Sequence, residues 1–380
     1  MKKVLIFSIA YYPRHVSGAE AAVKEITERI ADIEFHMVTL RFDPTDPAEE
    51  KIGTVLVHRV GSGSGYFSKI FFPVLAALKA RTLNKKYRFD ALWALMTYML
   101  LPVVLAKMLG VRAPHVFTLQ DGDPYGKVFG RVRIVPFVPL IDRGFRTASV
   151  IQVISSYLGS WPKLRGSTAP VELIRNGANP KDLKESVDHA TVKALKQKLG
   201  KKEGDVWLVN TARLEHQKAQ DDVIRALTLL PDNILFLIVG GGSDEVMLKN
   251  LTQELHLEDR VMFVGQVTRD EVTAYRKASD IFVGPSRSEG LGNAFLSAMA
   301  SRLPVVATAE GGLADFMSEN TGWVVPKDNP EAIAAAVKDI LAHPEKVKQI
   351  ADTARKMVED EYDWDAIAKE MRNRVFSKVL

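Results

Sequence analysis

The chain has 380 residues, of which 47% are hydrophobic and 26% charged, and it contains no cysteine. This length exceeds what one ordinary hydrophobic core needs and suits two domains, while the lack of cysteine excludes disulfides, thiolate metal sites and a cysteine nucleophile. The formal net charge of +5 comes from scattered residues, without an arginine-rich arm or zinc-ligand spacing, so we expect no nucleic-acid partner.

The first predicted unit is a strand over 4–9, a loop over 10–19 and a helix over 20–30. Its opening apolar run suits a buried strand and is too short for a secretory segment, so we expect a cytoplasmic protein. Gly18 would lie at the mouth of the helix, where its backbone N–H can approach a phosphate or a sugar. Arg14 and His15 could reach a ligand from the same loop, although His15 is explained more simply as a solvated loop residue.

A basic and apolar stretch over 66–87 follows predicted strands over 35–39 and 55–59. Such a stretch can lie on an anionic membrane surface, which makes peripheral contact with the inner face of a membrane one interpretation. A core-facing helix with solvated lysines explains the same pattern, and we favour it. The apolar run over 91–105 falls short of the ~20 residues of a membrane-spanning helix and indicates strand, turn and buried helix.

Gln120 and Asp121 end a predicted strand over 114–119. Glutamine can hydrogen-bond a sugar hydroxyl but cannot carry a proton in catalysis, whereas Asp121 supplies an acid. A strand over 149–154 closes the first half, and Asn176 with Gly177 forms a tight-turn pair. Proline and glycine cluster between 160 and 172, which indicates a domain boundary there.

The second half repeats the alternation of strand and helix, with a strand over 206–211 and a helix over 220–230. Arg213 and Lys218 lie five residues apart in the loop between them, so both side chains can converge beyond the end of the strand. Two cations beside a helix N-terminus suit a nucleotide diphosphate. A strand over 234–239 ends in Gly240 and Gly241, and further strand and helix patterns cover 261–264 and 271–278.

A βαβ unit then covers 280–307, with strands over 280–283 and 304–307 and a helix over 293–301. Its loop opens at the carboxyl end of the first strand, where open α/β sheets bind ligands. Glycines there let the chain approach a ligand, and Glu289 is an acceptor suited to sugar hydroxyls. Helical patterns over 330–342 and 344–359 follow, and a last helix begins near 362 and runs to 380.

The segment SRSEGLGNAFLSAMASRLPVVAT resembles the donor-site signature of family 4 glycosyltransferases, which are retaining enzymes of the GT-B architecture. The resemblance covers nearly the whole chain and is strongest over 206–326. It implies two Rossmann-like, doubly wound α/β domains that face each other across a cleft: an acceptor-side domain at 1–165 and a nucleotide-sugar donor domain at 166–360. A C-terminal helix at 361–380 would cross back onto the first domain.

The sequence departs from the family pattern at six positions. Ser297 replaces the second glutamate of the signature, and Gln120 replaces a histidine. Ser17, Ala212 and Ala219 replace glycines, and Asn179 replaces an aspartate. A serine at 297 cannot accept two hydrogen bonds from ribose hydroxyls as a carboxylate can. Arg213, Lys218 and Glu289 are retained and carry the expectation of activity.

By this resemblance the catalytic residues are Arg213, Lys218, Glu289 and Asp121. The donor would also contact Gly18, Gly240, Gly241, Gln266, Val267, Gly290, Leu291, Gly292, Asn293, Ala294 and Ser297. Arg14, His15, Gln120 and Asn176 would lie on the acceptor or sugar side. The donor is expected to be a nucleotide sugar, a UDP-sugar before GDP-mannose, and the acceptor a glycan or a lipid-linked sugar. We expect neither a metal ion nor another cofactor.

Two alternatives stay open. One is a catalytically weak or silent relative that binds a nucleotide sugar or a glycan, which the changes at Ser297 and Gln120 favour. The other is a GT-B epimerase of nucleotide sugars, which would need further carboxylates and a histidine near the sugar. A doubly wound dehydrogenase is disfavoured because no G-x-G-x-x-G motif follows the first strand.

Overall fold

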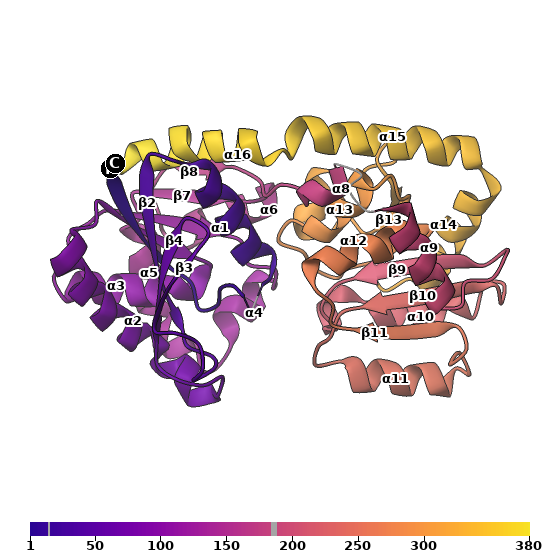
Figure 1. Cartoon of the computed structure of the whole chain (residues 1–380), viewed down its shortest axis with the longest axis horizontal. Coiled ribbons are helices and arrows are strands. Elements are labelled where there is room, and N and C mark those ends of the chain that lie inside the picture. The colour runs from indigo at the N-terminus through magenta and orange to yellow at the C-terminus, as the bar shows by residue number, and fades with distance from the viewer. Residues whose placement is uncertain (14–15, 184–187) are drawn as a thin grey trace. The chain divides into compact units, whose positions relative to one another are not determined.

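The computed structural model describes residues 1–13, 16–183 and 188–380, and the chain divides into two compact units (Figure 1). The first unit comprises Met1–Asn176 and Trp364–Leu380, and the second comprises Gly177–Asp363. The sequence predicted a boundary after residue 165. In the structure the first unit instead continues to Asn176. The reason is a short strand, Val171–Leu173, that pairs in parallel with Val150–Val153 and so extends the sheet of the first unit.

The first unit is built on an eight-stranded sheet in the order β3-β4-β2-β1-β5-β6-β7-β8, parallel except for β3. The strands are β1 (Lys2–Phe7), β2 (Ile33–Leu40), β3 (Glu49–Ile52), β4 (Val55–Val60), β5 (Ala91–Leu95), β6 (His115–Leu119), β7 (Val150–Val153) and β8 (Val171–Leu173). The helices are α1 (Gly18–Arg29), α2 (Tyr66–Tyr87), α3 (Leu100–Met108), α4 (Tyr125–Gly130), α5 (Val138–Arg146), α6 (Ser156–Gly159), α7 (Trp161–Leu164) and α16 (Trp364–Glu370). Short 3-10 turns cover Thr97–Met99 and Val135–Phe137.

Helices cover both faces of this sheet, which is why its central strands are apolar on both sides. All five residues of β5, for example, are buried, as expected for a strand of a parallel sheet packed from above and below. The helices α2, α3 and α5 pack in succession on one face. On the other face α1 lies against α16, the yellow end of the chain in Figure 1.

The C-terminal segment returns to the first unit, as the sequence predicted. Trp364, Met371 and Phe376 are buried there in one core with β1, β2 and α1. The segment is not one helix to residue 380, however. After α16 the chain continues as a π turn over Met371–Val375 and a 3-10 turn over Phe376–Lys378.

The second unit is built on a six-stranded parallel sheet in the order β11-β10-β9-β12-β13-β14. Its strands are β9 (Val206–Thr211), β10 (Ile234–Val239), β11 (Val261–Gly265), β12 (Ile281–Gly284), β13 (Val305–Ala307) and β14 (Trp323–Val324). Its helices are α8 (Pro180–Leu183), α9 (His189–Lys198), α10 (Gln220–Leu227), α11 (Glu245–Glu254), α12 (Arg269–Ala278), α13 (Asn293–Ala300), α14 (Pro330–Ala342) and α15 (Pro344–Glu361). Turns of 3-10 helix cover His216–Lys218 and Gly311–Asp315.

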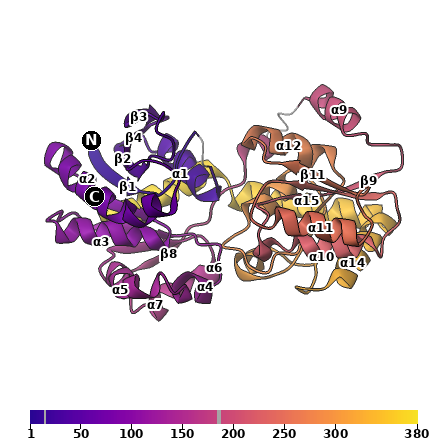
Figure 2. The same ribbon diagram turned by 90° about the horizontal axis from the view of Figure 1, so that it is seen from below.

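This strand order makes the sheet doubly wound. The chain runs outward from β9 to β11 and then returns to add β12 to β14 on the other side of β9. Helices α10, α11 and α14 pack on one face, and α12 with α9 beside it lies on the other (Figure 2). The order reverses between β9 and β12, and ligands of such sheets bind beyond the carboxyl ends of the strands at that reversal.

Candidate functional site

The loops that follow β9 and β12 meet at the reversal point of the second sheet. The β9 loop carries Arg213 and Lys218, and the β12 loop carries Glu289. The two loops are joined by a hydrogen bond from the Arg287 N–H to the Gln217 carbonyl, 2.8 Å. The two stretches that the sequence singled out thus form one continuous rim of the sheet.

Lys218 and Glu289 are in direct contact across this rim. The Lys218 Nζ lies 2.6 Å from the Glu289 Oε1, and the two side chains are only 12% and 10% exposed. The same carboxylate oxygen accepts a hydrogen bond from the Ser286 hydroxyl at 3.0 Å. The Ser286 carbonyl in turn accepts one from the Thr308 hydroxyl at 2.6 Å. The acid is therefore held by Lys218 and Ser286, and Thr308 anchors the backbone of Ser286.

Arg213 belongs to the same loop but does not contact Glu289. Its Nη1 lies 2.6 Å from the Glu215 Oε1, and its side chain is 62% exposed. The Gln220 side chain donates to the Arg213 carbonyl at 3.1 Å, which ties the loop to the start of α10. Of the two predicted cations, Lys218 is thus fixed against the acid, and Arg213 is exposed and paired with Glu215.

Arg287 was missed by the sequence reasoning, although it stands two residues before Glu289 in the signature. It bridges Asp221 at 2.9 Å, Asp222 at 3.0 Å and Asp328 at 2.5 Å. Burial opposes its charge, but the hydrogen bonds to Asp221 and Asp328 outweigh burial and raise the pKa of Arg287. Asp221 and Asp222 lie in the first turn of α10, and this pair of acids could have indicated a nearby cation.

Glycines bring the loops of this rim into backbone contact. A Cβ at Gly240 would lie 2.0 Å from the Ala212 carbonyl oxygen, and a Cβ at Gly312 would lie 2.1 Å from the Gly290 carbonyl oxygen. Gln266 lies beside the same turn, because a Cβ at Gly241 would meet its Cβ at 4.0 Å. The exposed Gln266 and half-buried Val267 follow the Gly265 end of β11.

The helix α13 opens toward this rim. Gly292 is its N-cap with a φ of 101°, and Asn293 and Ala294 form its first turn. The N–H groups of a first helical turn have no acceptor within the helix and attract anions. Gly290 and Leu291 lead into the helix, and Leu291 is buried.

Ser297 lies one turn further along α13 and is 6% exposed. Its hydroxyl oxygen accepts a hydrogen bond from the Asn179 N–H at 3.3 Å, and the Asn179 side chain donates to Thr273 at 3.3 Å. Two of the departures from the family pattern, Ser297 and Asn179, are therefore in contact with each other. The hydroxyl supports the chain after the unit boundary.

In the first unit, Asp121 is buried at the end of β6. Its carboxylate accepts hydrogen bonds from the Thr97 N–H at 3.1 Å and the Thr97 hydroxyl at 2.9 Å. Burial raises the pKa of Asp121 to about 6, against the lowering effect of these hydrogen bonds. Thr97 was not anticipated from the sequence.

Gln120 and Asn176 contact each other in the first unit, since the Asn176 side chain donates to the Gln120 Oε1 at 3.0 Å. Both are buried. Gly18 opens α1 directly after its N-cap Ser17, whose N–H is bonded to the Glu20 carboxylate at 2.7 Å. Arg14 and His15, predicted on the acceptor side, lie outside the described residues.

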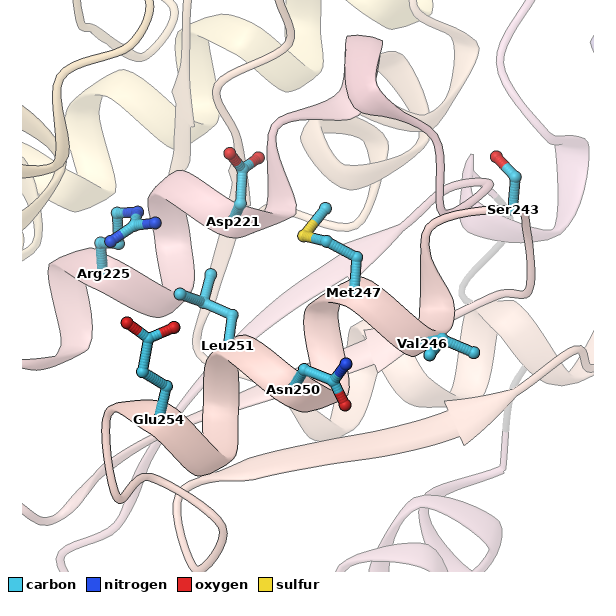
Figure 3. A pocket seen from close by; sticks show the side chains of 8 residues that line it. All are labelled: Asp221, Arg225, Ser243, Val246, Met247, Asn250, Leu251 and Glu254. Carbon is cyan, nitrogen blue, oxygen red and sulfur yellow. The ribbon is translucent and has the colours of Figure 1, made fainter.

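A groove of about 510 Å³ lies elsewhere in the second unit, between α10 and α11 (Figure 3). It is lined by Asp221, Arg225, Ser243, Val246, Met247, Asn250, Leu251 and Glu254. None of these is a predicted site residue. Seven of its eight lining residues lie on α10 and α11, and Ser243 lies in the loop between β10 and α11. Neither Lys218 nor Glu289 lines it, so we do not assign the donor to it.

Comparison with known proteins agrees with this geometry. Residues 191–357 match the family model described as glycosyl transferases group 1. Over this segment, which is less than half of the chain, the sequence is similar to that family. The group 1 segment includes Arg213, Lys218, Glu289 and the whole six-stranded sheet.

Individual relatives extend the similarity beyond the group 1 segment. An uncharacterised glycosyltransferase of Methanocaldococcus jannaschii is 31% identical over 53% of this chain and 53% of its own length. The GDP-mannose-dependent alpha-(1-6)-phosphatidylinositol monomannoside mannosyltransferase of Mycobacterium tuberculosis is 29% identical over 58% of this chain and 60% of its own length. The chain thus aligns with little more than half the length of these relatives.

A solved structure extends the likeness in fold to the whole chain. The HepE protein of Anabaena, solved in complex with UDP and glucose, superposes with a TM-score of 0.81 over 99% of this chain and all of that one. At 20% identity this likeness concerns the fold alone. With the two doubly wound sheets it confirms the GT-B fold class that the sequence predicted.

Proposed function

We propose that the protein is a retaining glycosyltransferase that transfers a sugar from a nucleotide-diphosphate sugar to a glycan or lipid-linked acceptor. The observation that carries the proposal is the contact of Lys218 with Glu289 at the reversal point of the second sheet. A cation and an acid at that point can hold a diphosphate and a sugar at once. The group 1 family match over 191–357 supports the same chemistry.

Each group would have a separate task in the transfer. Lys218 and the exposed Arg213 would neutralise the charge that develops on the leaving diphosphate, together with the first-turn N–H groups of α13. When the diphosphate draws Lys218 toward itself, the Glu289 carboxylate would be free to accept hydrogen bonds from sugar hydroxyls. Ser286 would keep that carboxylate in place.

Retention of configuration would follow from substitution on one face of the sugar. The acceptor oxygen forms its bond to the anomeric carbon on the side from which the phosphate oxygen departs. The departing phosphate oxygen accepts the proton of the acceptor hydroxyl. No protein base is then required. This fits a chain in which Gln120 stands where the family pattern has a histidine.

The donor is a UDP-sugar or GDP-mannose. The mycobacterial relative is named for GDP-mannose, and the HepE structure contains UDP and glucose. We expect a UDP-sugar first. The lipid in the name of the mycobacterial relative makes a lipid-linked acceptor the first class to test.

The test is transfer of radiolabelled sugar from a panel of UDP- and GDP-sugars to glycan and lipid-linked acceptors, with Lys218→Ala as the inactive control. Transfer from one donor that the control abolishes supports the proposal. If the wild-type chain binds no nucleotide sugar and transfers none, the proposal is wrong.

A second candidate is a protein that binds a nucleotide sugar without transferring it. It is favoured by the engagement of Gln120 with Asn176 and of Ser297 with Asn179, which leaves these side chains in structural contacts. Calorimetry separates the two candidates. If the chain binds a nucleotide sugar but releases neither sugar nor nucleotide from it, the second candidate is correct.

A further inference from the structure

The helix α2 is apolar on the side that faces away from its own sheet. Phe72, Ala76, Ala77, Ala80 and Leu83 form its buried face. The exposed large apolar residues of the helix are Tyr66, Phe67, Ile70, Phe71, Val74, Leu75 and Leu78. Their spacing of three and four places them along one side of the helix. A helix that is apolar on both sides is expected inside a protein or a membrane, and this one is exposed.

A second exposed segment joins this face. Val132 is 89% exposed, Val135 53% and Phe137 43%. The Arg133 guanidinium lies over the ring of Tyr66, 5.9 Å from its centroid, and connects the two segments within the first unit. We call the exposed apolar residues of α2 together with those of 132–137 the α2 surface.

Both segments of the α2 surface contain positive charge. The sequence of α2 contains five lysines and arginines and no acid. Lys79 is paired with Glu49 at 3.1 Å, while Lys69, Arg81 and Lys85 are exposed. In the second segment Arg131 is paired with Asp123 at 2.7 Å, and Arg133 is exposed. The unneutralised charges of the surface are therefore cationic.

We propose that the α2 surface docks the protein on a bilayer that contains anionic phospholipid. Aromatic and aliphatic side chains would enter the boundary of head groups and acyl chains, and the lysines and arginines would meet the phosphates. A second copy of the chain is a poorer occupant, because the same cations would face one another. This inference goes beyond the proposed function and does not depend on it.

The test is flotation of the full chain with vesicles of phosphatidylcholine alone or with about one-third phosphatidylglycerol. We expect binding to the anionic vesicles that is about tenfold tighter and that weakens as salt is added. Phe67→Ser with Phe71→Ser should lower this binding about tenfold or more. Lys69→Glu with Arg133→Glu should lower it on anionic vesicles only.

The matched control is Val246→Ser with Met247→Ser, which removes residues 70% and 44% exposed on α11. It should leave vesicle binding unchanged. All these positions are exposed, and equal melting temperatures would show that the variants fold.

Three results would overturn the proposal. They are absence of binding to either vesicle, equal binding to both, and equal loss in the α11 control. Sedimentation of the chain as a dimer that Phe67→Ser with Phe71→Ser dissociates would assign the surface to self-association instead. Nucleotide-sugar binding is measured separately, so failure here leaves the proposed function intact.

Discussion

At the residue scale, Lys218 and Glu289 form an ion pair that is almost removed from water. Charges this far from solvent stabilise a fold only while both are present, because either one alone keeps its desolvation cost without compensation. Under the proposed function, the pair would keep a cation and an acid in place before the donor binds. If a diphosphate separated the two side chains, Lys218 would pair with the phosphate and Glu289 with the sugar hydroxyls.

Lys218→Ala should therefore lower both stability and transfer. We expect a loss of about 3 kcal/mol in the free energy of unfolding, since Glu289 stays buried and unpaired. The double variant Lys218→Met with Glu289→Gln should recover most of that stability and none of the transfer. Denaturant unfolding and the transfer assay measure the two effects. A single variant as stable as the wild type would contradict the account of the pair.

Asp121 makes stability depend on pH. Its pKa is raised from the ordinary value of 3.8 to about 6, so the folded state favours the protonated acid. The stability it contributes is complete below about pH 4 and is lost as the pH rises through about 6, by about 3 kcal/mol in total. Asp121→Asn keeps an acceptor for the Thr97 groups and should remove this slope. Parallel curves for both proteins from pH 4 to 7 would contradict the raised pKa.

At the scale of elements, the conformation of the turns around the second sheet depends on glycines and on one alanine with a strained backbone. Ala219 lies between the 3-10 turn and α10 with a φ of 55°, a backbone conformation that favours glycine. An alanine in the left-handed region costs roughly 1–2 kcal/mol. The loop that carries Lys218 is thus held in place at some cost in stability.

Ala219→Gly should stabilise the protein by up to about 1 kcal/mol, since the relief of strain exceeds the added flexibility of the unfolded chain. Ala226→Gly, inside α10, is the matched control and should destabilise by about 1 kcal/mol or more. Both changes are followed by thermal unfolding. Destabilisation by both would show that no strain is stored at position 219.

The glycine turn after β10 supports a second contrast. Gly240→Ala should destabilise strongly and disturb the Arg213 loop, because its Cβ would lie 2.0 Å from the Ala212 carbonyl oxygen at a φ of 148°. Gly241→Ala should be nearly neutral, since the nearest atom is 4.0 Å away. Nucleotide binding and melting temperature compare the two. Similar behaviour of the pair would contradict the close approach at Gly240.

At the scale of the whole molecule, the chain end completes the core of the first unit. Trp364, Met371 and Phe376 pack against β1, β2 and α1, although hundreds of residues separate them in the sequence. The first unit is therefore finished only when the last residues are in place. In the part of the chain that the structure describes, no helix has both the length and the apolar character to cross a bilayer.

Deletion of residues 364–380 should destabilise the first unit and leave the second largely intact. Hydrogen exchange would show lost protection in β1 and α1 and retained protection in β9 and β10. Arg372→Ala is the control, because its pair with Asp32 is exposed and should contribute less than about 1 kcal/mol. Equal loss of protection in both units would show that they do not unfold separately.

The sequence determined the class of fold and showed which loops carry the candidate site residues. Apolar strand patterns alternating with helices, and the 280–307 unit with its Glu289, are local features that a reader of the chain can find. Because parallel strands carry their loops at one edge, Lys218 and Glu289 could be expected to approach each other. The membrane-like composition of 66–87 was also visible, but whether those apolar residues face the core was not.

The tertiary structure alone decided which side chains are free and which are engaged. Periodicity does not reveal that Arg213 pairs with Glu215, that Ser297 supports Asn179, or that Arg287 joins three aspartates. The same holds for β8, whose three residues are too few to signal a strand and which moved the boundary past residue 165. Apart from the local pair of Arg213 with Glu215, these outcomes depend on packing between residues that are far apart in the sequence, and such contacts leave no pattern in the local sequence.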